Sequence, residues 1–248
     1  NDASSGAGEG IWSTPAIDRR LGLLFVGTGQ NLGPPPGPLE DAVLAIDVRT
    51  GKLRWAHQFF TNDVFSAGHP GGYDYDFGAS PNLWTVRGRT LVGDGEKSGT
   101  YEALDAATGR LVWQRSLVAG GSFGGLLGSA AYVDGRLVVS ANVGKSNPKA
   151  SKILALDPAT GATRWSDDLT GDVLGPISAV PGVAFVGTDQ DEMVAIDTAT
   201  GGQLWRYDAP GPVASGPSIV DGRVLWGYGF TLFSGPGPGG ILNFAVRR

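Results

Sequence analysis

Apolar residues along this chain gather in short runs, and turn-forming residues rather than a helical repeat follow each run. In the clearest case, residues 44–55, an apolar run precedes Asp47, a Thr-Gly pair follows it, and Trp55 ends the segment. The same order returns in three further copies, which end at Trp113, Trp165 and Trp205. The core of the pattern is constant while the spacers vary, so we expect equivalent structural units joined by loops of different length.

Each copy predicts a strand, a tight turn and a return strand. The carboxylate of Asp47 can accept backbone N–H groups inside the turn, and Gly51 can adopt the positive φ that a tight connection requires. The tryptophan then lies on the return strand, where its large ring can pack against the neighbouring unit.

Two further strand-like runs precede each copy, so every unit has four predicted strands. A fifth unit after residue 212 lacks the Asp-Thr-Gly-Trp pattern and is short of one strand. A four-stranded sheet cannot bury both faces alone, whereas radial stacking of sheets covers them. We therefore predict an all-β fold, a β-propeller of four-stranded antiparallel blades with about five blades present. The first runs of the units are predicted at 11–17, 79–86, 129–133, 176–180 and 213–220.

The predicted blades form a single domain, or part of one, over residues 1–248. They cover approximately residues 9–60, 77–117, 126–169, 174–208 and 213–248.

Composition narrows the choice of partners. The net charge is −5 and no basic cluster exceeds the pair Arg247-Arg248, so a nucleic-acid or anionic-membrane partner is not expected. No apolar run is long enough for a membrane span. The 248 residues contain no cysteine, which excludes disulfides, cysteine-ligated zinc and a c-type haem site within this sequence.

The repeat resembles the pyrroloquinoline quinone (PQQ) repeat, which occurs in quinoprotein dehydrogenases and in non-enzymatic propellers. Stretches outside the repeat make the resemblance more specific to PQQ-dependent alcohol dehydrogenases, above all the polyvinyl alcohol dehydrogenase branch. These stretches are residues 10–18, 23–31, 73–81, 93–101 and 227–235. The resemblance implies the C-terminal part of an eight-bladed propeller, with about three blades absent at the N-terminal side. It also implies PQQ and Ca²⁺ as cofactors, a cytochrome c electron acceptor and a periplasmic or secreted location.

The same resemblance implies a cofactor role for three residues. Trp12 would stack under the PQQ plane, and Gly29 belongs to the Gly-Thr-Gly loop beside it. Lys97 would hydrogen bond to the quinone oxygens and stabilise the charge that develops as the quinone is reduced. The alternatives are an ordinary tryptophan between blades and a solvated surface lysine.

The resemblance also implies which residues bind calcium and which residue accepts the proton of the alcohol. Gln30 stands where the family has a calcium-binding asparagine, and Asn31 could take its place. Asp76 would be both a calcium ligand and the base that takes the hydroxyl proton; Asp74 is its close competitor and Asp63 a weaker one. Asp74 and Asp76 would share one face if the segment is an extended strand, and their like charges would raise one pKa.

Three functional hypotheses follow. The first is a dehydrogenase that oxidises a secondary alcohol or polyol, including polymers such as polyvinyl alcohol, by aspartate-assisted hydride transfer to PQQ. The second is a non-catalytic propeller that binds proteins as an envelope scaffold. The third is that this segment alone is inactive, because five blades of an eight-bladed ring would leave two open edges. A closed five-bladed ring is the alternative to such an open set of blades.

Overall fold

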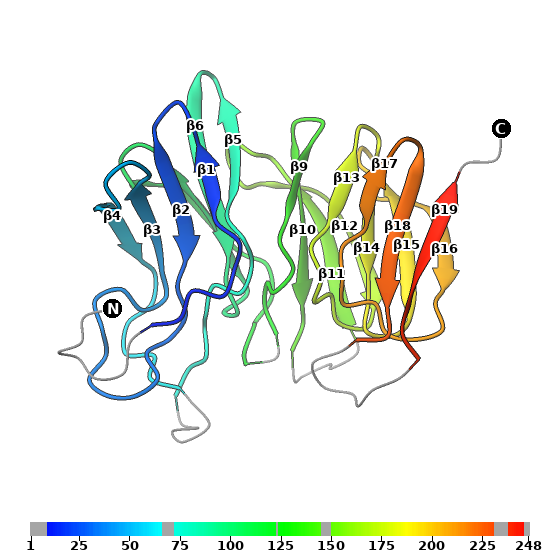
Figure 1. The fold of residues 1–248 in the computed structure, drawn as a ribbon, viewed down its shortest axis with the longest axis horizontal. Coiled ribbons are helices and arrows are strands. Elements are labelled where there is room, and N and C mark those ends of the chain that lie inside the picture. The colour runs from blue at the N-terminus through cyan, green and yellow to red at the C-terminus, as the bar shows by residue number, and fades with distance from the viewer. Residues whose placement is uncertain (1–8, 66–71, 123, 145–149, 231–237, 246–248) are drawn as a thin grey trace.

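The computed structural model describes residues 9–65, 72–122, 124–144, 150–230 and 238–245. Within these ranges the chain forms strands and turns, without helices (Figure 1). The predicted all-β class is therefore confirmed. No described segment is a helix long and apolar enough to cross a membrane.

Five antiparallel sheets follow one another along the chain, and within each sheet the strands pair in sequence order. The first two sheets contain β1 (Ala16–Asp18), β2 (Leu23–Gly27), β3 (Ala42–Asp47) and β4 (Leu53–Gln58), then β5 (Asn82–Val86), β6 (Arg89–Gly95), β7 (Thr100–Asp105) and β8 (Leu111–Ser116). The third and fourth contain β9 (Ala131–Val133), β10 (Arg136–Asn142), β11 (Ala150–Leu156) and β12 (Thr163–Thr170), then β13 (Ser178–Val180), β14 (Val183–Gly187), β15 (Glu192–Asp197) and β16 (Gln203–Asp208). The fifth contains β17 (Ser218–Val220), β18 (Arg223–Tyr228) and β19 (Gly240–Ala245).

The first strand of each sheet is shorter than the sequence pattern predicts. β1, β5 and β17 each begin directly after a proline, namely Pro15, Pro81 and Pro217. Proline has no backbone N–H to donate to a strand ladder, so the pairing cannot extend through it. The predicted starts at residues 11, 79 and 213 are therefore too early.

The predicted turn chemistry is present. Asp47 Oδ1 accepts the backbone N–H groups of Arg49 at 3.0 Å and Thr50 at 2.9 Å, and Gly51 has φ +68°. The corresponding aspartates Asp105, Asp157 and Asp197 accept the same pair of N–H groups in their own turns.

Tryptophans of the outer strands join the first four sheets to one another. Three indole N–H groups donate to the backbone carbonyl that follows the turn aspartate of the next sheet: Trp55 to Ala106 at 3.2 Å, Trp113 to Pro158 at 3.1 Å and Trp165 to Thr198 at 3.0 Å. Buried apolar clusters fill the space between neighbouring sheets. Sheet faces that would otherwise be exposed are buried in this way.

The short strands β1, β5, β9, β13 and β17 contact one another in chain order, so they form the inner side of the row. The first and fifth sheets lie at opposite ends of this row (Figure 1). Segments that connect one sheet to the next, together with turns within the sheets, carry the site described below.

Candidate cofactor and active site

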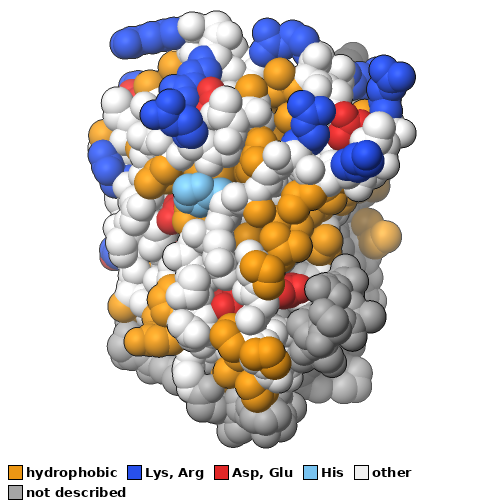
Figure 2. Space-filling model, turned by 90° about the vertical axis from the view of Figure 1, so that its left-hand side faces the viewer, with side chains coloured by type: hydrophobic (Ala, Val, Ile, Leu, Met, Phe, Trp, Pro, Cys, Tyr) orange, Lys and Arg blue, Asp and Glu red, His pale blue; other side chains and the backbone are white. Residues whose placement is uncertain are grey.

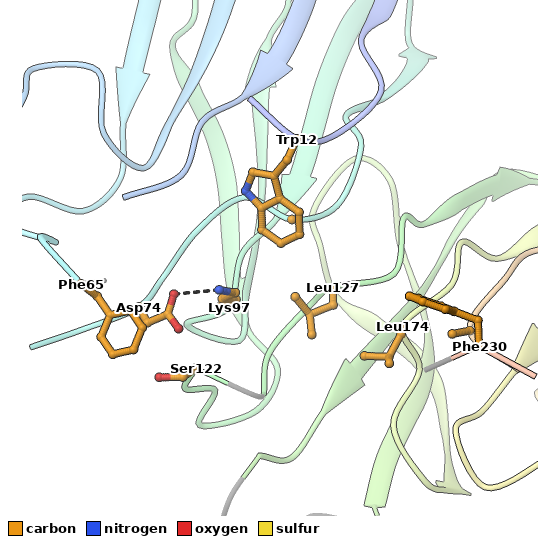
Figure 3. Close-up of a pocket in the computed structure, with 10 residues that line it drawn as sticks. Trp12, Phe65, Asp74, Lys97, Ser122, Leu127, Leu174 and Phe230 are labelled. Carbon is orange, nitrogen blue, oxygen red and sulfur yellow. Dashed lines mark hydrogen bonds and ion pairs between the residues drawn. The ribbon is translucent and has the colours of Figure 1, made fainter. Parts of the chain in front are cut away.

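A cavity of about 360 Å³ lies at the inner ends of the sheets. It is lined by Trp12, Phe65, Asp74, Gly78, Lys97, Ser122, Leu127, Leu174, Ala214 and Phe230. In Figure 3, Phe65, Asp74, Lys97 and Ser122 lie toward one side of the pocket, and Leu174 and Phe230 lie toward the other. The lining residues come from connections spread over the whole row of sheets, so the pocket exists only when the sheets are assembled.

Trp12 precedes β1, and its side chain stays accessible from the pocket. The residue is 55% exposed, although most other tryptophans of the chain are packed between sheets. Two glycines leave room for its ring: a Cβ at Gly78 would lie 2.6 Å from Trp12 Cη2, and one at Gly29 would lie 3.3 Å from Nε1. The ring is therefore positioned by close backbone approach, with surface free for a ligand.

Lys97 lies in the turn between β6 and β7 and pairs with both aspartates of the Asp-Tyr-Asp segment. Its Nζ is 2.7 Å from Asp74 Oδ1 and also donates to Asp76 Oδ2. The side chains of Lys97, Asp74 and Asp76 are 12%, 6% and 3% exposed. Lys97 Nζ also lies 5.5 Å from the centroid of the Trp12 ring, within the range of a cation–π contact.

The pKa values of this group reflect burial and charge together. Burial, followed by the carboxyl group of Asp76, raises the pKa of Asp74 to about 6. Burial acts to lower the pKa of Lys97, but the charges of Asp76 and Asp74 outweigh it and raise that pKa. Asp76 thus raises the pKa of Asp74, as predicted for two neighbouring carboxylates, but burial raises it more. Residues 73–81 form no strand, so a shared strand face is not the reason why the two carboxylates meet.

The loop Gly29–Asn31 places amide groups beside Asp76. The Gln30 backbone N–H donates to Asp76 Oδ1 at 2.8 Å, and the Gln30 side-chain amide donates to the carbonyl of Phe65 at 3.0 Å. Asn31 is fully buried, and its Oδ1 has no hydrogen-bond partner among the described residues. The side-chain oxygens of Gln30, Asn31 and Asp76 are hard donors of the type that Ca²⁺ prefers. No three His, Cys, Asp or Glu side chains in the described ranges are arranged to hold a metal ion.

Asp63 does not line the pocket. Its Oδ2 accepts the backbone N–H of Tyr75 at 2.7 Å and its Oδ1 that of Phe65 at 3.2 Å. These bonds hold the segment that carries Asp74 and Asp76, which is a positioning role.

Sequence reasoning missed the buried carboxylates behind the site. Glu40 and Asp41, directly before β3, are fully buried, and Glu96 is nearly so. Burial, followed by the charges of Asp63, Asp76, Glu96 and Glu40, raises the pKa of Asp41 to about 9. The one available signal was an acidic pair directly before the most apolar strand of the repeat. The pocket walls formed by Phe65, Ser122 and Leu174 had no sequence signal.

Comparison with known families decides the class of this propeller. A family model described as outer membrane protein assembly factor BamB, built on the PQQ repeat, matches residues 97–212 and 149–230. A second model, described as the β-propeller domain of glucose, ethanol and alcohol dehydrogenases, matches residues 1–114. The chain belongs to the PQQ β-propeller family.

Relatives of this PQQ propeller include two polyvinylalcohol dehydrogenases. The chain is 32% identical over 205 residues to the one from Pseudomonas sp. and 31% identical over 213 residues to the one from Sphingopyxis sp. strain 113P3. Each match covers 73% of this chain and 32% of the relative, so the chain spans about a third of their length. The crystal structure of quinohemoprotein alcohol dehydrogenase from Comamonas testosteroni superposes with a TM-score of 0.74 at 19% identity. That match covers 98% of this chain and 50% of the other, and it supports the fold.

Proposed function

We propose that this PQQ propeller contributes the quinone-binding and proton-accepting part of an alcohol dehydrogenase. The observation that carries the proposal is the meeting of an exposed indole, an ammonium and two buried carboxylates at one cavity. Trp12, Lys97 and Asp74 all line that cavity, and Asp76, which does not line it, forms an ion pair with Lys97. Sequence similarity to two polyvinylalcohol dehydrogenases supports the same reaction class.

The residues present fit PQQ. A flat aromatic ligand can stack on the accessible ring of Trp12, for which Gly29 and Gly78 make room. The ammonium of Lys97 can hydrogen bond to anionic oxygens of the ligand and stabilise negative charge on them. When bound, PQQ supplies a two-electron acceptor for the hydride that leaves the alcohol carbon.

The proton of the alcohol hydroxyl goes to the Asp74–Asp76 pair. Asp74 is the member that lines the pocket, and with a pKa of about 6 it is mostly ionised at neutral pH. Asp76 is held by the Gln30 N–H and by Lys97, so it keeps the ammonium in position and tunes its neighbour. The apolar side chains of Leu127, Leu174 and Phe230 also line the cavity.

Calcium is the second cofactor of the proposal, with Gln30, Asn31 and Asp76 as oxygen donors. Three donors are fewer than the six to eight that Ca²⁺ takes, so we assign no step of the reaction to the ion. We further propose a secondary alcohol or polyol substrate, including polyvinyl-alcohol-like polymers, a cytochrome c electron acceptor and a periplasmic or secreted location.

A PQQ titration tests the proposal. We expect saturable quenching of tryptophan fluorescence by PQQ in the presence of Ca²⁺, and loss of at least about tenfold in affinity in Trp12→Ala, which removes the stacking ring. The matched control is Trp205→Ala, a tryptophan 36% exposed outside this pocket, which should bind PQQ as the parent does. Dye-linked oxidation of a secondary alcohol should fall in Asp74→Asn. Equal PQQ affinity in the parent, Trp12→Ala and Trp205→Ala would contradict the proposal.

The second candidate is a protein-binding scaffold of the bacterial envelope. It is favoured by the match of residues 97–230 to the BamB model. A protein-binding scaffold should show no saturable binding of PQQ, so the same titration distinguishes it from a dehydrogenase.

A further inference from the structure

The hairpin turns β1–β2, β3–β4, β5–β6 and β7–β8 lie at the end of the first two sheets that is remote from the pocket. Trp12 and Lys97, which line the pocket, precede β1 and follow β6, whereas these turns join the opposite ends of the same strands. A ligand bound at the turns would therefore leave the pocket open.

Basic side chains gather at this end over the first two sheets. Residues 18–23, 47–54, 86–89 and 105–112, which contain the four turns, carry eight Lys and Arg and three Asp. The corresponding turns of the other three sheets carry three Arg and four Asp; they are residues 133–136, 156–164, 180–183, 197–204 and 220–223. Figure 2 views the molecule from the first sheet and shows Lys and Arg side chains grouped at its upper end. The whole chain has a net charge of −5, so this excess of cations is local.

An open groove of about 490 Å³ lies between the first and second sheets at the same end. Its lining comes from β1, β5 and the residues around the turns that follow them. Ile17, Leu83 and Trp84 supply apolar surface, and Ile17 is 54% exposed. Arg19 and Arg20 supply two guanidinium groups. The complement of such a lining is a ligand that carries both acidic and apolar groups.

Both arginines are available to a ligand. The Arg20 guanidinium donates to Thr90 Oγ1 at 2.7 Å, which holds it across the groove and leaves its other N–H groups for an acceptor. Within the described ranges, no carboxylate forms an ion pair with Arg19 or Arg20. Asp18 also lines the groove, but its Oδ1 accepts the backbone N–H groups of Arg20 at 2.8 Å and Leu21 at 3.0 Å. Its charge is therefore partly satisfied by its own turn.

The third and fourth sheets show that packing between sheets does not require arginine at this position. There the turn residue Asp134 joins the sheets, because its Oδ2 accepts the backbone N–H of Gly182 at 2.7 Å and the hydroxyl of Thr198 at 2.9 Å. The chain's own carboxylate thus connects those two sheets, whereas a guanidinium group connects the first two. A carboxylate from another molecule can pair with a guanidinium group through two parallel hydrogen bonds.

We propose that this groove binds an acidic peptide segment of a partner protein, with its carboxylates paired to Arg19 and Arg20. An apolar side chain of the peptide would pack on Ile17. Exposed cations continue beyond the groove, at Arg49 and Arg87, so several acidic residues in a row fit better than one small anion. The apolar lining favours a peptide over a nucleic acid, whose phosphates supply no apolar group. Such binding is independent of a quinone at the pocket.

Fluorescence anisotropy with a labelled acidic peptide tests the site. The probe is fluorescein-labelled Glu-Glu-Leu-Glu-Glu-Leu at about 50 mM NaCl, where charges are weakly screened, and Lys-Lys-Leu-Lys-Lys-Leu is the charge-reversed control. We expect saturable binding of the acidic peptide and not of the basic one. Amide hydrogen exchange of residues 18–23 and 86–89 should slow in the complex, because the peptide covers them.

Two substitutions test the charged and the apolar part of the groove separately. Arg19→Glu should weaken binding at least about tenfold, because it removes a charge-assisted hydrogen bond and adds repulsion. Ile17→Ser should weaken binding at least about threefold, because it removes apolar contact area. The matched control is Arg223→Glu, at an exposed arginine in a hairpin turn of the fifth sheet, and this variant should bind the acidic peptide as the parent does.

Failure of the parent to bind the acidic peptide, or equal losses in Arg19→Glu and Arg223→Glu, would overturn the proposal. Unchanged affinity in Ile17→Ser would reduce the site to one for any anion and overturn the peptide as its occupant. Phosphatidylglycerol vesicles that bind the parent and displace the peptide would instead identify an anionic membrane. Self-association that Arg19→Glu removes would identify a second copy of this chain. Either of these two results would also overturn the proposal.

Discussion

Lys97→Met tests whether charge neutralisation holds the site together. In the described structure, Lys97 forms the ion pairs of both Asp74 and Asp76, whose side chains are only 6% and 3% exposed. Methionine keeps the length and the apolar stem of lysine but leaves both carboxylates without a cation. The substitution therefore isolates the charge.

The expected loss follows from the burial of the pair. Removing one partner of a buried ion pair costs about 3–5 kcal/mol, because the other charge stays desolvated. Lys97 is itself 12% exposed, so water can partly rehydrate the carboxylates once the ammonium is gone. We expect the free energy of unfolding at pH 8 to fall by about 3 kcal/mol.

The sign of the pH dependence follows from Asp74. Lys97 lowers the pKa of Asp74, so the variant has an even higher pKa than about 6. An aspartate whose folded pKa is raised above its ordinary value destabilises the fold where it is ionised, and this penalty disappears as protonation neutralises it. The loss in Lys97→Met should therefore be largest at pH 8 and smaller at pH 5.

Urea unfolding at the two pH values, followed by circular dichroism, measures both effects. Arg89→Met is the matched control, because the Arg89–Asp105 pair is at the surface, with the arginine side chain 51% exposed. That variant should lose less than about 1 kcal/mol. The reasoning is refuted if Lys97→Met loses no more than Arg89→Met, or if its loss does not change with pH.

Three other outcomes are expected. Gly78→Ala should displace the Trp12 ring, whose Cη2 lies 2.6 Å from the added Cβ, and weaken PQQ binding in the fluorescence titration; unchanged affinity would show that the ring is free to move. Trp113→Ala should lower the free energy of unfolding in urea by about 3–5 kcal/mol, since Trp113 is 6% exposed, and Trp205→Ala by about half of that or less. Burial raises the pKa of Asp41 to about 9, so between pH 5 and pH 8 this carboxyl group is ionised in the unfolded chain but mostly protonated in the folded chain. The free energy of unfolding should therefore decline as the pH rises through this range. Asp41→Asn should flatten this decline in urea unfolding, and an unchanged slope would assign it to other groups.

Much of the fold was predictable because it rests on local chemistry repeated along the chain. Asp47, Thr50 and Gly51 form their turn through bonds between near neighbours, so the residue types alone are enough to identify it. Strand ends were less predictable. The position of Pro217 limits β17, and hydrophobicity alone extended that strand too far.

The candidate site was predictable only as a set of residues. Sequence similarity to a known family selected Trp12, Gln30, Asp76 and Lys97, but no local pattern states their distances. The ion pair between Lys97 and Asp74 joins residues far apart in the chain, and the packing of one sheet on the next brings them together.

Short-range hydrogen bonding and alternating burial act within a few residues, so the order of amino acids was sufficient for the repeat, the turns and the class of fold. Electrostatics and desolvation depend on what surrounds a group in space. The burial of Glu40 and Asp41 and the raised pKa of Asp74 therefore became visible only after the sheets had been assembled.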